Sequence, residues 1–130
     1  MQAMIKVLAT GSFDPLHKGH IFYLKEAKKL GDKLYVIVSS DEKIRKNKHR
    51  EPRQGQKVRA QGVRSLKIVD KVIIGEGEQF SLIDKINPDI IALGYDQKIP
   101  EPLKNKVKQY KIITLKPYRP EIYKSSLISK

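Results

Sequence analysis

The chain has 130 residues, of which 39% are hydrophobic and 32% charged, a composition typical of one soluble globular domain spanning residues 1–130. It contains no cysteine, which excludes disulfides, thiolate metal sites and a cysteine nucleophile. No apolar run approaches the roughly 18 to 20 residues that cross a bilayer, so we expect a cytoplasmic protein without a membrane partner.

The net charge of +13 indicates an anionic partner, and nucleic acid is the first class to consider. The lysines, however, are spread along the whole chain, and no block of five like charges appears. Aromatic residues make up only 7% of the sequence, so the stacking platforms that bind single-stranded nucleic acid are sparse. These observations argue against nucleic acid and favour a phosphate-rich small molecule.

Apolar, β-branched runs alternate with stretches of helical periodicity along the chain. The predicted strands lie at residues 5–9, 34–39, 72–74, 90–93 and 112–115, and the predicted helices at residues 20–30, 56–66, 80–86 and 101–110. This order predicts an α/β, Rossmann-like single domain with a five-stranded parallel sheet and helices on both faces. Ligands of such sheets bind beyond the carboxyl ends of the strands, so we expect the functional site there.

The turn between the first strand and the first helix has the features of a phosphate site. The N–H groups and the positive dipole end of a helix N-terminus attract an anion. Two histidines three residues apart add hydrogen-bond donors, which would stabilise the charge that grows on a transferring phosphoryl group. The residues assigned to nucleotide binding in this turn are Gly11, Ser12, Phe13, His17, Lys18, Gly19 and His20.

The segment from Ser39 to Arg53 begins at the end of a predicted strand and is strongly basic. We predict a flexible cationic loop that closes over a triphosphate, screens its charge and excludes water. Lys46 and Lys48 lie in this segment, and Arg59 lies on the predicted helix that follows it.

The run Gly11-Ser12-Phe13-Asp14, followed by His17-Lys18-Gly19-His20, resembles the signature of the nucleotidyltransferase superfamily that includes cytidylyltransferases and adenylyltransferases. The resemblance implies transfer of a nucleotidyl group to a phosphate-bearing substrate, with release of pyrophosphate. It also implies that His17 and His20 contact the triphosphate and stabilise the pentacoordinate α-phosphate. Ser12 stands where the family usually has threonine, a change that keeps the hydroxyl.

The same resemblance assigns catalytic roles in the basic region. A lysine of this region is catalytic in the family, and Lys48 matches it best, with Lys46 as the alternative. Arg59 matches a family arginine, and we predict that it is catalytic as well.

Two later segments complete the predicted pocket. The tetrapeptide Gly94-Tyr95-Asp96-Gln97 follows the fourth predicted strand, where Asp96 would hold a ribose hydroxyl or fix the turn. Ser125 and Ser126 head an apolar helical turn near the end of the chain. Paired serines are good N-caps, and their hydroxyls and N–H groups can also bind phosphate.

Taken together, these segments make nearly the whole chain resemble the archaeal FAD synthases, which are FMN adenylyltransferases. The features that carry the resemblance are the tetrapeptide at 94–97, the loop around Lys48, Arg64-Ser65-Leu66-Lys67, and Tyr118-Arg119-Pro120 before the paired serines. The resemblance implies that ATP and FMN give FAD and pyrophosphate, with a divalent cation such as Mg²⁺ bound mainly through substrate phosphates. It adds Asp96 and Tyr123 to the ATP-binding residues and implies a homodimer.

Two alternatives remain, the first another nucleotidyltransferase and the second a protein of a different class. A glycerol-3-phosphate-type cytidylyltransferase would use CTP, but its relatives usually carry an acidic pair with an aromatic in place of the tetrapeptide at 94–97. A basic nucleic-acid-binding module would instead show binding that weakens steeply with salt and no turnover.

Overall fold

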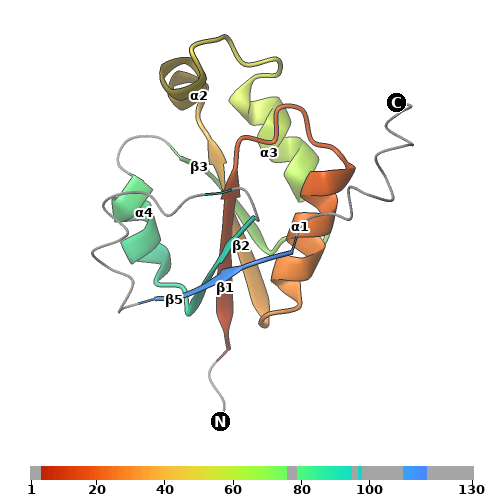
Figure 1. Cartoon of the computed structure of the whole chain (residues 1–130), viewed down its shortest axis with the longest axis vertical. Helices are drawn as coiled ribbons and strands as arrows, with labels where there is room; N and C mark the ends of the chain where they lie inside the picture. Colours follow the sequence, from red (N-terminus) through yellow and green to blue (C-terminus); the bar gives the residue numbers. More distant parts are fainter. Residues whose placement is uncertain (1–3, 76–78, 95–96, 98–109, 117–130) are drawn as a thin grey trace.

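The computed structural model describes residues 4–75, 79–94, 97 and 110–116. Its elements in chain order are β1 (Lys6–Gly11), α1 (Lys18–Lys28), β2 (Lys33–Ser39), α2 (Asp41–Lys48), α3 (Gln56–Arg64), β3 (Lys71–Gly75), α4 (Gln79–Ile86), β4 (Ile90–Leu93) and β5 (Lys111–Thr114). The five strands form one parallel sheet in the order β3-β2-β1-β4-β5 (Figure 1). The strand order reverses at β1, which makes the carboxyl end of β1 the switch point where ligands of such sheets bind.

Two apolar cores lie on opposite faces of the sheet, because successive strand residues point to opposite sides. Val7 and Ala9 pack in the core that includes Leu24 of α1 and Val63 of α3. Leu8 belongs to the second core, together with Ile83 and Ile86 of α4. Burying one such leucine completely contributes about 1.5–3 kcal/mol. The predicted α/β sheet with helices on both faces is therefore confirmed.

The predicted strands agree closely with the observed ones, and every boundary falls within two residues. The three predicted helices that became α1, α3 and α4 agree equally well at their bounds. The helix predicted over residues 101–110 lies outside the described residues, apart from Tyr110. Within the part of the chain that the structure describes, no helix is long and apolar enough to cross a membrane.

The basic segment after β2 differs from its prediction as a flexible loop, because its first part is helix α2. The Ser40 hydroxyl caps this helix by accepting a hydrogen bond from the Lys43 N–H at 3.2 Å. Acidic residues in the first turn and basic residues in the last turn both complement the helix dipole. Ile44 is buried and holds α2 to the body of the protein. The loop prediction is therefore wrong for these eight residues.

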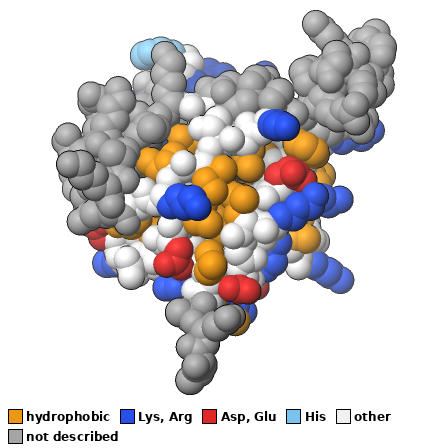
Figure 2. All heavy atoms as spheres, turned by 60° about the horizontal axis from the view of Figure 1, so that its bottom comes forward, with side chains coloured by type: hydrophobic (Ala, Val, Ile, Leu, Met, Phe, Trp, Pro, Cys, Tyr) orange, Lys and Arg blue, Asp and Glu red, His pale blue; other side chains and the backbone are white. Residues whose placement is uncertain are grey.

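Aspartates cap the amino end of the sheet. Each aspartate directly precedes one strand. It accepts a hydrogen bond from a main-chain N–H in a neighbouring strand, or from the residue directly before that neighbouring strand. The pairs are Asp32 with Ile5 at 2.8 Å, Asp89 with Lys6 at 2.8 Å, and Asp70 with Leu34 at 2.7 Å. Figure 2 shows acidic side chains among lysines and apolar groups on this side of the molecule. Side-chain carboxylates therefore satisfy main-chain N–H groups at the start of the sheet.

Candidate active site at the carboxyl end of the sheet

The signature turn leaves β1 at the switch point and enters α1 at Lys18. Phe13 has a left-handed φ of 49°, and its fully buried ring supports the turn from beneath. A Cβ on Gly11 would lie 2.9 Å from this ring, so glycine is needed where the backbone crosses it. The ring also meets His20 edge-on, with 5.1 Å between the ring centroids. Phe13 therefore shapes the turn with its side chain.

The two histidines cap α1 and stack on each other, with 3.7 Å between ring centroids. His17 Nδ1 accepts a hydrogen bond from the Gly19 N–H at 3.1 Å, and His20 Nδ1 accepts one from the His17 N–H at 3.3 Å. A neutral imidazole that accepts through Nδ1 carries its proton on Nε2. The cap thus fixes both rings in the tautomer with an Nε2–H donor, the form suited to a phosphate oxygen.

Lys48, the last residue of α2, reaches the signature turn from a distant part of the sequence. Its Nζ donates to the Ser12 hydroxyl at 3.0 Å. Among the described lysines of α2, Lys46 has no such contact with the turn and is exposed. The structure therefore brings Lys48 into the site and places the alternative lysine outside it.

Asp14 anchors the segment that follows α2. Its side chain is completely buried. Asp14 Oδ2 accepts hydrogen bonds from the Arg53 N–H at 2.7 Å and from Arg50 Nη1 at 3.0 Å, and Oδ1 accepts one from the Gln54 N–H at 2.8 Å. Burial opposes ionisation, but these hydrogen bonds outweigh it and lower the pKa of Asp14. Sequence reasoning missed Asp14 as a site residue, although it is the carboxylate of the signature and a basic segment follows.

Arg59 lies behind the site with its guanidinium buried. It donates to the carbonyl oxygens of Ser12 at 2.8 Å, Ser39 at 2.7 Å and Gln54 at 2.8 Å, and to Asp41 Oδ1 at 2.8 Å. These bonds tie the end of β1 to the end of β2 and to the start of α2. The geometry favours a positioning role for Arg59 over contact with a substrate.

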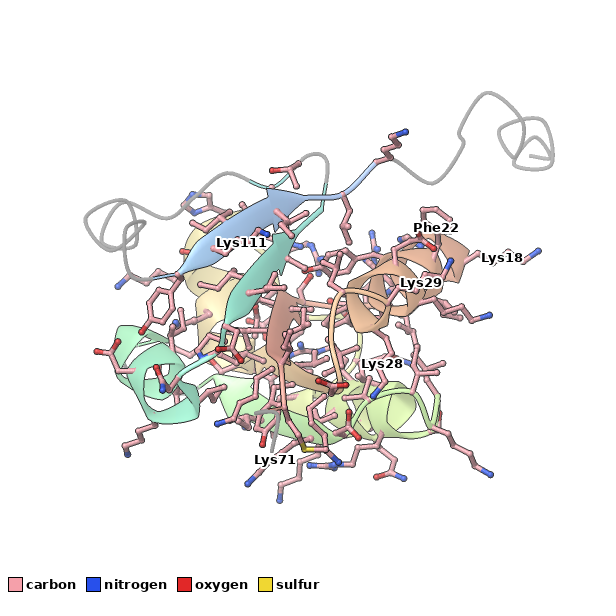
Figure 3. The ribbon with its side chains drawn as sticks, turned by 90° about the horizontal axis from the view of Figure 1, so that it is seen from below. Lys18, Phe22, Lys28, Lys29, Lys71 and Lys111 are labelled. Carbon is pink, nitrogen blue, oxygen red and sulfur yellow. The ribbon has the colours of Figure 1, made fainter. Side chains whose placement is uncertain are left out.

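The other predicted site residues fall into two groups. Lys18 is exposed at the start of α1, and its side chain extends away from the body of the protein (Figure 3). The remaining ones, which lie outside the described residues, are Asp96, Tyr123, Ser125 and Ser126.

Comparison with known proteins decides the family. Residues 8–129 match the family model described as cytidylyltransferase-like. The chain belongs to this family. It is 43% identical to the FAD synthase of Thermoplasma volcanium, over 98% of this chain and 93% of that protein. It is 49% identical to the FAD synthase of Thermococcus onnurineus, over 83% of this chain and 74% of that protein. These relatives confirm the resemblance to the archaeal FAD synthases.

Two solved structures share this fold. A crystal structure described as the lipopolysaccharide core biosynthesis protein of Thermoplasma volcanium superposes with a TM-score of 0.81 at 44% identity, over 89% of this chain and 99% of that one. The pantoate-β-alanine ligase of Francisella tularensis superposes with a TM-score of 0.61 at 17% identity, over 89% of this chain and 60% of that one. At the lower identity, the likeness shows the fold alone.

Proposed function

We propose that this family member is an FMN adenylyltransferase, which transfers AMP from ATP to FMN and releases FAD and pyrophosphate. The observation that carries the proposal is one juxtaposition. Two Nε2–H donors at a helix N-terminus lie in the same turn as Ser12, which the Lys48 ammonium contacts. The choice of FMN as the acceptor is supported by the relatives named FAD synthase. The geometry of the described residues supports a phosphate site and does not bear on a flavin.

The reaction needs one in-line displacement. A phosphate oxygen of FMN attacks the α-phosphorus of ATP, the bond to the bridging oxygen breaks, and pyrophosphate leaves with the electron pair. Positioning and charge stabilisation supply most of the catalysis in such transfers, and no covalent enzyme intermediate is needed. His17 and His20 would donate to α-phosphate oxygens, while Lys48 would neutralise charge on the triphosphate.

The remaining residues divide into anchors and further ligands. Asp14 and Arg59 would hold the segments that carry the donors. Ser12 and the N–H groups at the start of α1 would bind phosphate oxygens. The other predicted ATP ligands, Asp96, Tyr123, Ser125 and Ser126, stay predictions, as do the homodimer and the cytoplasmic location.

The magnesium ion belongs with the nucleotide in this proposal. Among the described residues, no group of three or more His, Asp or Glu side chains gathers into a metal site. Asp14 and Asp41 are already bonded to Arg50 and Arg59. Mg²⁺ is commonly bound through substrate phosphates with few protein ligands. ATP would therefore enter as its magnesium complex.

The direct test incubates the purified protein with Mg²⁺, FMN and each nucleoside triphosphate, and separates the flavins by chromatography. We expect FAD from ATP and release of one pyrophosphate per FAD. A parallel reaction supplies CTP and glycerol 3-phosphate. Formation of CDP-glycerol without any FAD would overturn the flavin assignment in favour of the cytidylyltransferase alternative.

A further inference from the structure

The pairing of β1 with its two neighbouring strands ends at different residues of β1. Pairing of β1 with β2 continues to Gly11 and Val38, the last residues of the register. Pairing of β1 with β4 ends two residues earlier, at Ala9 and Ala92. The sheet therefore opens between β1 and β4 just below the signature turn, at the switch point where ligands of open α/β sheets bind.

Gln97 bridges this opening with its side-chain amide. Its Nε2 donates to the Thr10 carbonyl at 3.0 Å, and its Oε1 accepts from the Gly94 N–H at 2.6 Å. In a parallel ladder, the next rung above Ala9 and Ala92 would join that N–H directly to that carbonyl. The amide occupies the place of the missing rung, so the two strands stay linked but further apart. The Gln97 N–H also donates to the Gly94 carbonyl at 3.0 Å, which fixes the backbone that carries the amide.

Tyr23 of α1 makes a second bridge at the same height. Its hydroxyl accepts from the Thr10 N–H at 3.2 Å and donates to the Ala92 carbonyl at 2.6 Å. Burial raises the pKa of Tyr23, so the hydroxyl keeps the proton that it donates. Both main-chain polar groups of Thr10 are thus bonded to side chains.

We propose that Gln97 is a positioning residue of the nucleotide site, and that Tyr23 shares this role. The two side chains hold Thr10 at a set distance from the end of β4. Thr10 is followed directly by Gly11 and Ser12, so its position determines the position of the signature turn. The inference rests on the proposed function. Displacing the turn would lengthen its hydrogen bonds to the triphosphate and weaken ATP binding, so this distance matters for ATP use.

Two substitutions of Gln97 test the bridge. Gln97→Met has a similar length and makes neither hydrogen bond. Gln97→Glu keeps the acceptor for the Gly94 N–H but turns a carboxylate oxygen toward the Thr10 carbonyl. We expect KM for ATP to rise about tenfold in Gln97→Met and further in Gln97→Glu, with kcat and KM for FMN changed less than about threefold.

Tyr110→Phe is the matched control. It removes a single side-chain hydrogen bond, from the Tyr110 hydroxyl to Asp84 Oδ1 at 2.8 Å, in the core on the α4 face of the sheet. We expect wild-type KM for ATP in this variant. Tyr23→Phe is the second test of the bridge if Gln97→Met fails to fold, and it should raise KM for ATP as well.

The outcomes separate the two proposals. A KM for ATP that stays at the wild-type value in the Gln97 variants, with only a lower melting temperature, would overturn the positioning role. If the wild type makes no FAD, the proposed function fails. The affinity for Mg·ATP, measured by calorimetry, still tests the positioning role of Gln97. Weaker binding by Gln97→Met than by Tyr110→Phe would support positioning, and equal binding would contradict it.

Discussion

Asp70 and Asp14 are bonded in similar ways at opposite ends of the sheet. Asp70 accepts from the Leu34 N–H at 2.7 Å and from Lys28 Nζ at 2.8 Å, at the amino end. Asp14 accepts from two main-chain N–H groups and one arginine at the carboxyl end. In both, hydrogen bonds outweigh burial and lower the pKa. The partners differ in what they carry.

At the amino end, the carboxylate bonds to a helix and a strand of the core fold. Asp70 joins β2 to α1, and both elements already pack in the core that contains Leu24 and Val63. At the carboxyl end, the partner is a segment that follows directly on Lys48, and Lys48 contacts Ser12. The same carboxylate chemistry therefore stabilises the fold at one end and positions donors at the other. We expect substitutions to separate these two effects.

The largest effect should come from His17→Asn. Asparagine is a good N-cap, so it preserves the start of α1 while removing the Nε2–H donor. Loss of one donor to a charge-bearing transition state lowers kcat by about 10²–10³-fold. Steady-state kinetics of FAD formation measures the loss, and a melting curve checks that the fold survives. Wild-type kcat in this variant would contradict the assignment of His17.

Lys48→Met should follow, with Lys46→Met as its matched control on the same helix. Removing the cation that reaches Ser12 should lower kcat/KM for ATP by about 10²-fold, whereas the exposed Lys46 should change it less than about twofold. Equal losses in the two variants would mean that the basic segment acts only through its overall charge. A series of salt concentrations would then show the same slope for both.

Asp14→Asn should have a smaller effect on activity than either donor substitution. The amide keeps one acceptor oxygen but turns its NH₂ group either toward the Gln54 N–H or toward Arg50 and the Arg53 N–H together. Lys48 then loses a fixed position rather than its charge, so kcat/KM should fall about tenfold. Adding Asp14→Asn to Lys48→Met tests the coupling, because a residue that acts through Lys48 should cause little further loss. A full additional tenfold loss in the double variant would show that Asp14 acts independently of Lys48.

The fold was more predictable from sequence than the site, for a physical reason. Buried parallel strands read as apolar runs, so all five could be found. Helix α2 was missed because its basic residues resemble a solvated loop, although Ser40 is a readable N-cap signal. The contacts of Lys48 with Ser12 and of Gln97 with Thr10 join segments far apart in the chain. Such contacts depend on tertiary packing, which local patterns do not encode.

The signature shows the same division at the level of single residues. A motif identifies which residues gather at a site, but not which atoms face the ligand. Phe13 was assigned to the site from the signature and Arg59 from the family resemblance, and the structure buries both side chains beneath or behind the site. Asp14 was passed over in the same motif and proves to hold three hydrogen bonds. Supporting residues of a site are therefore as hard to separate from its ligands by sequence as they are necessary to it.

Asp70→Asn should have the smallest effect on activity and should act on stability instead. It weakens hydrogen bonds to a partly exposed carboxylate, so we expect a loss of about 1 kcal/mol in the free energy of unfolding at pH 7, with kcat/KM unchanged. Because the folded pKa of Asp70 is lowered, its contribution is present above the unfolded value of about 3.9 and is lost as pH falls through the folded pKa. The unfolding free energies of wild type and variant, measured with denaturant, should therefore converge as the pH falls through the folded pKa. A difference that persists at low pH would show that Asp70 stabilises the amino end through packing and not through its charge.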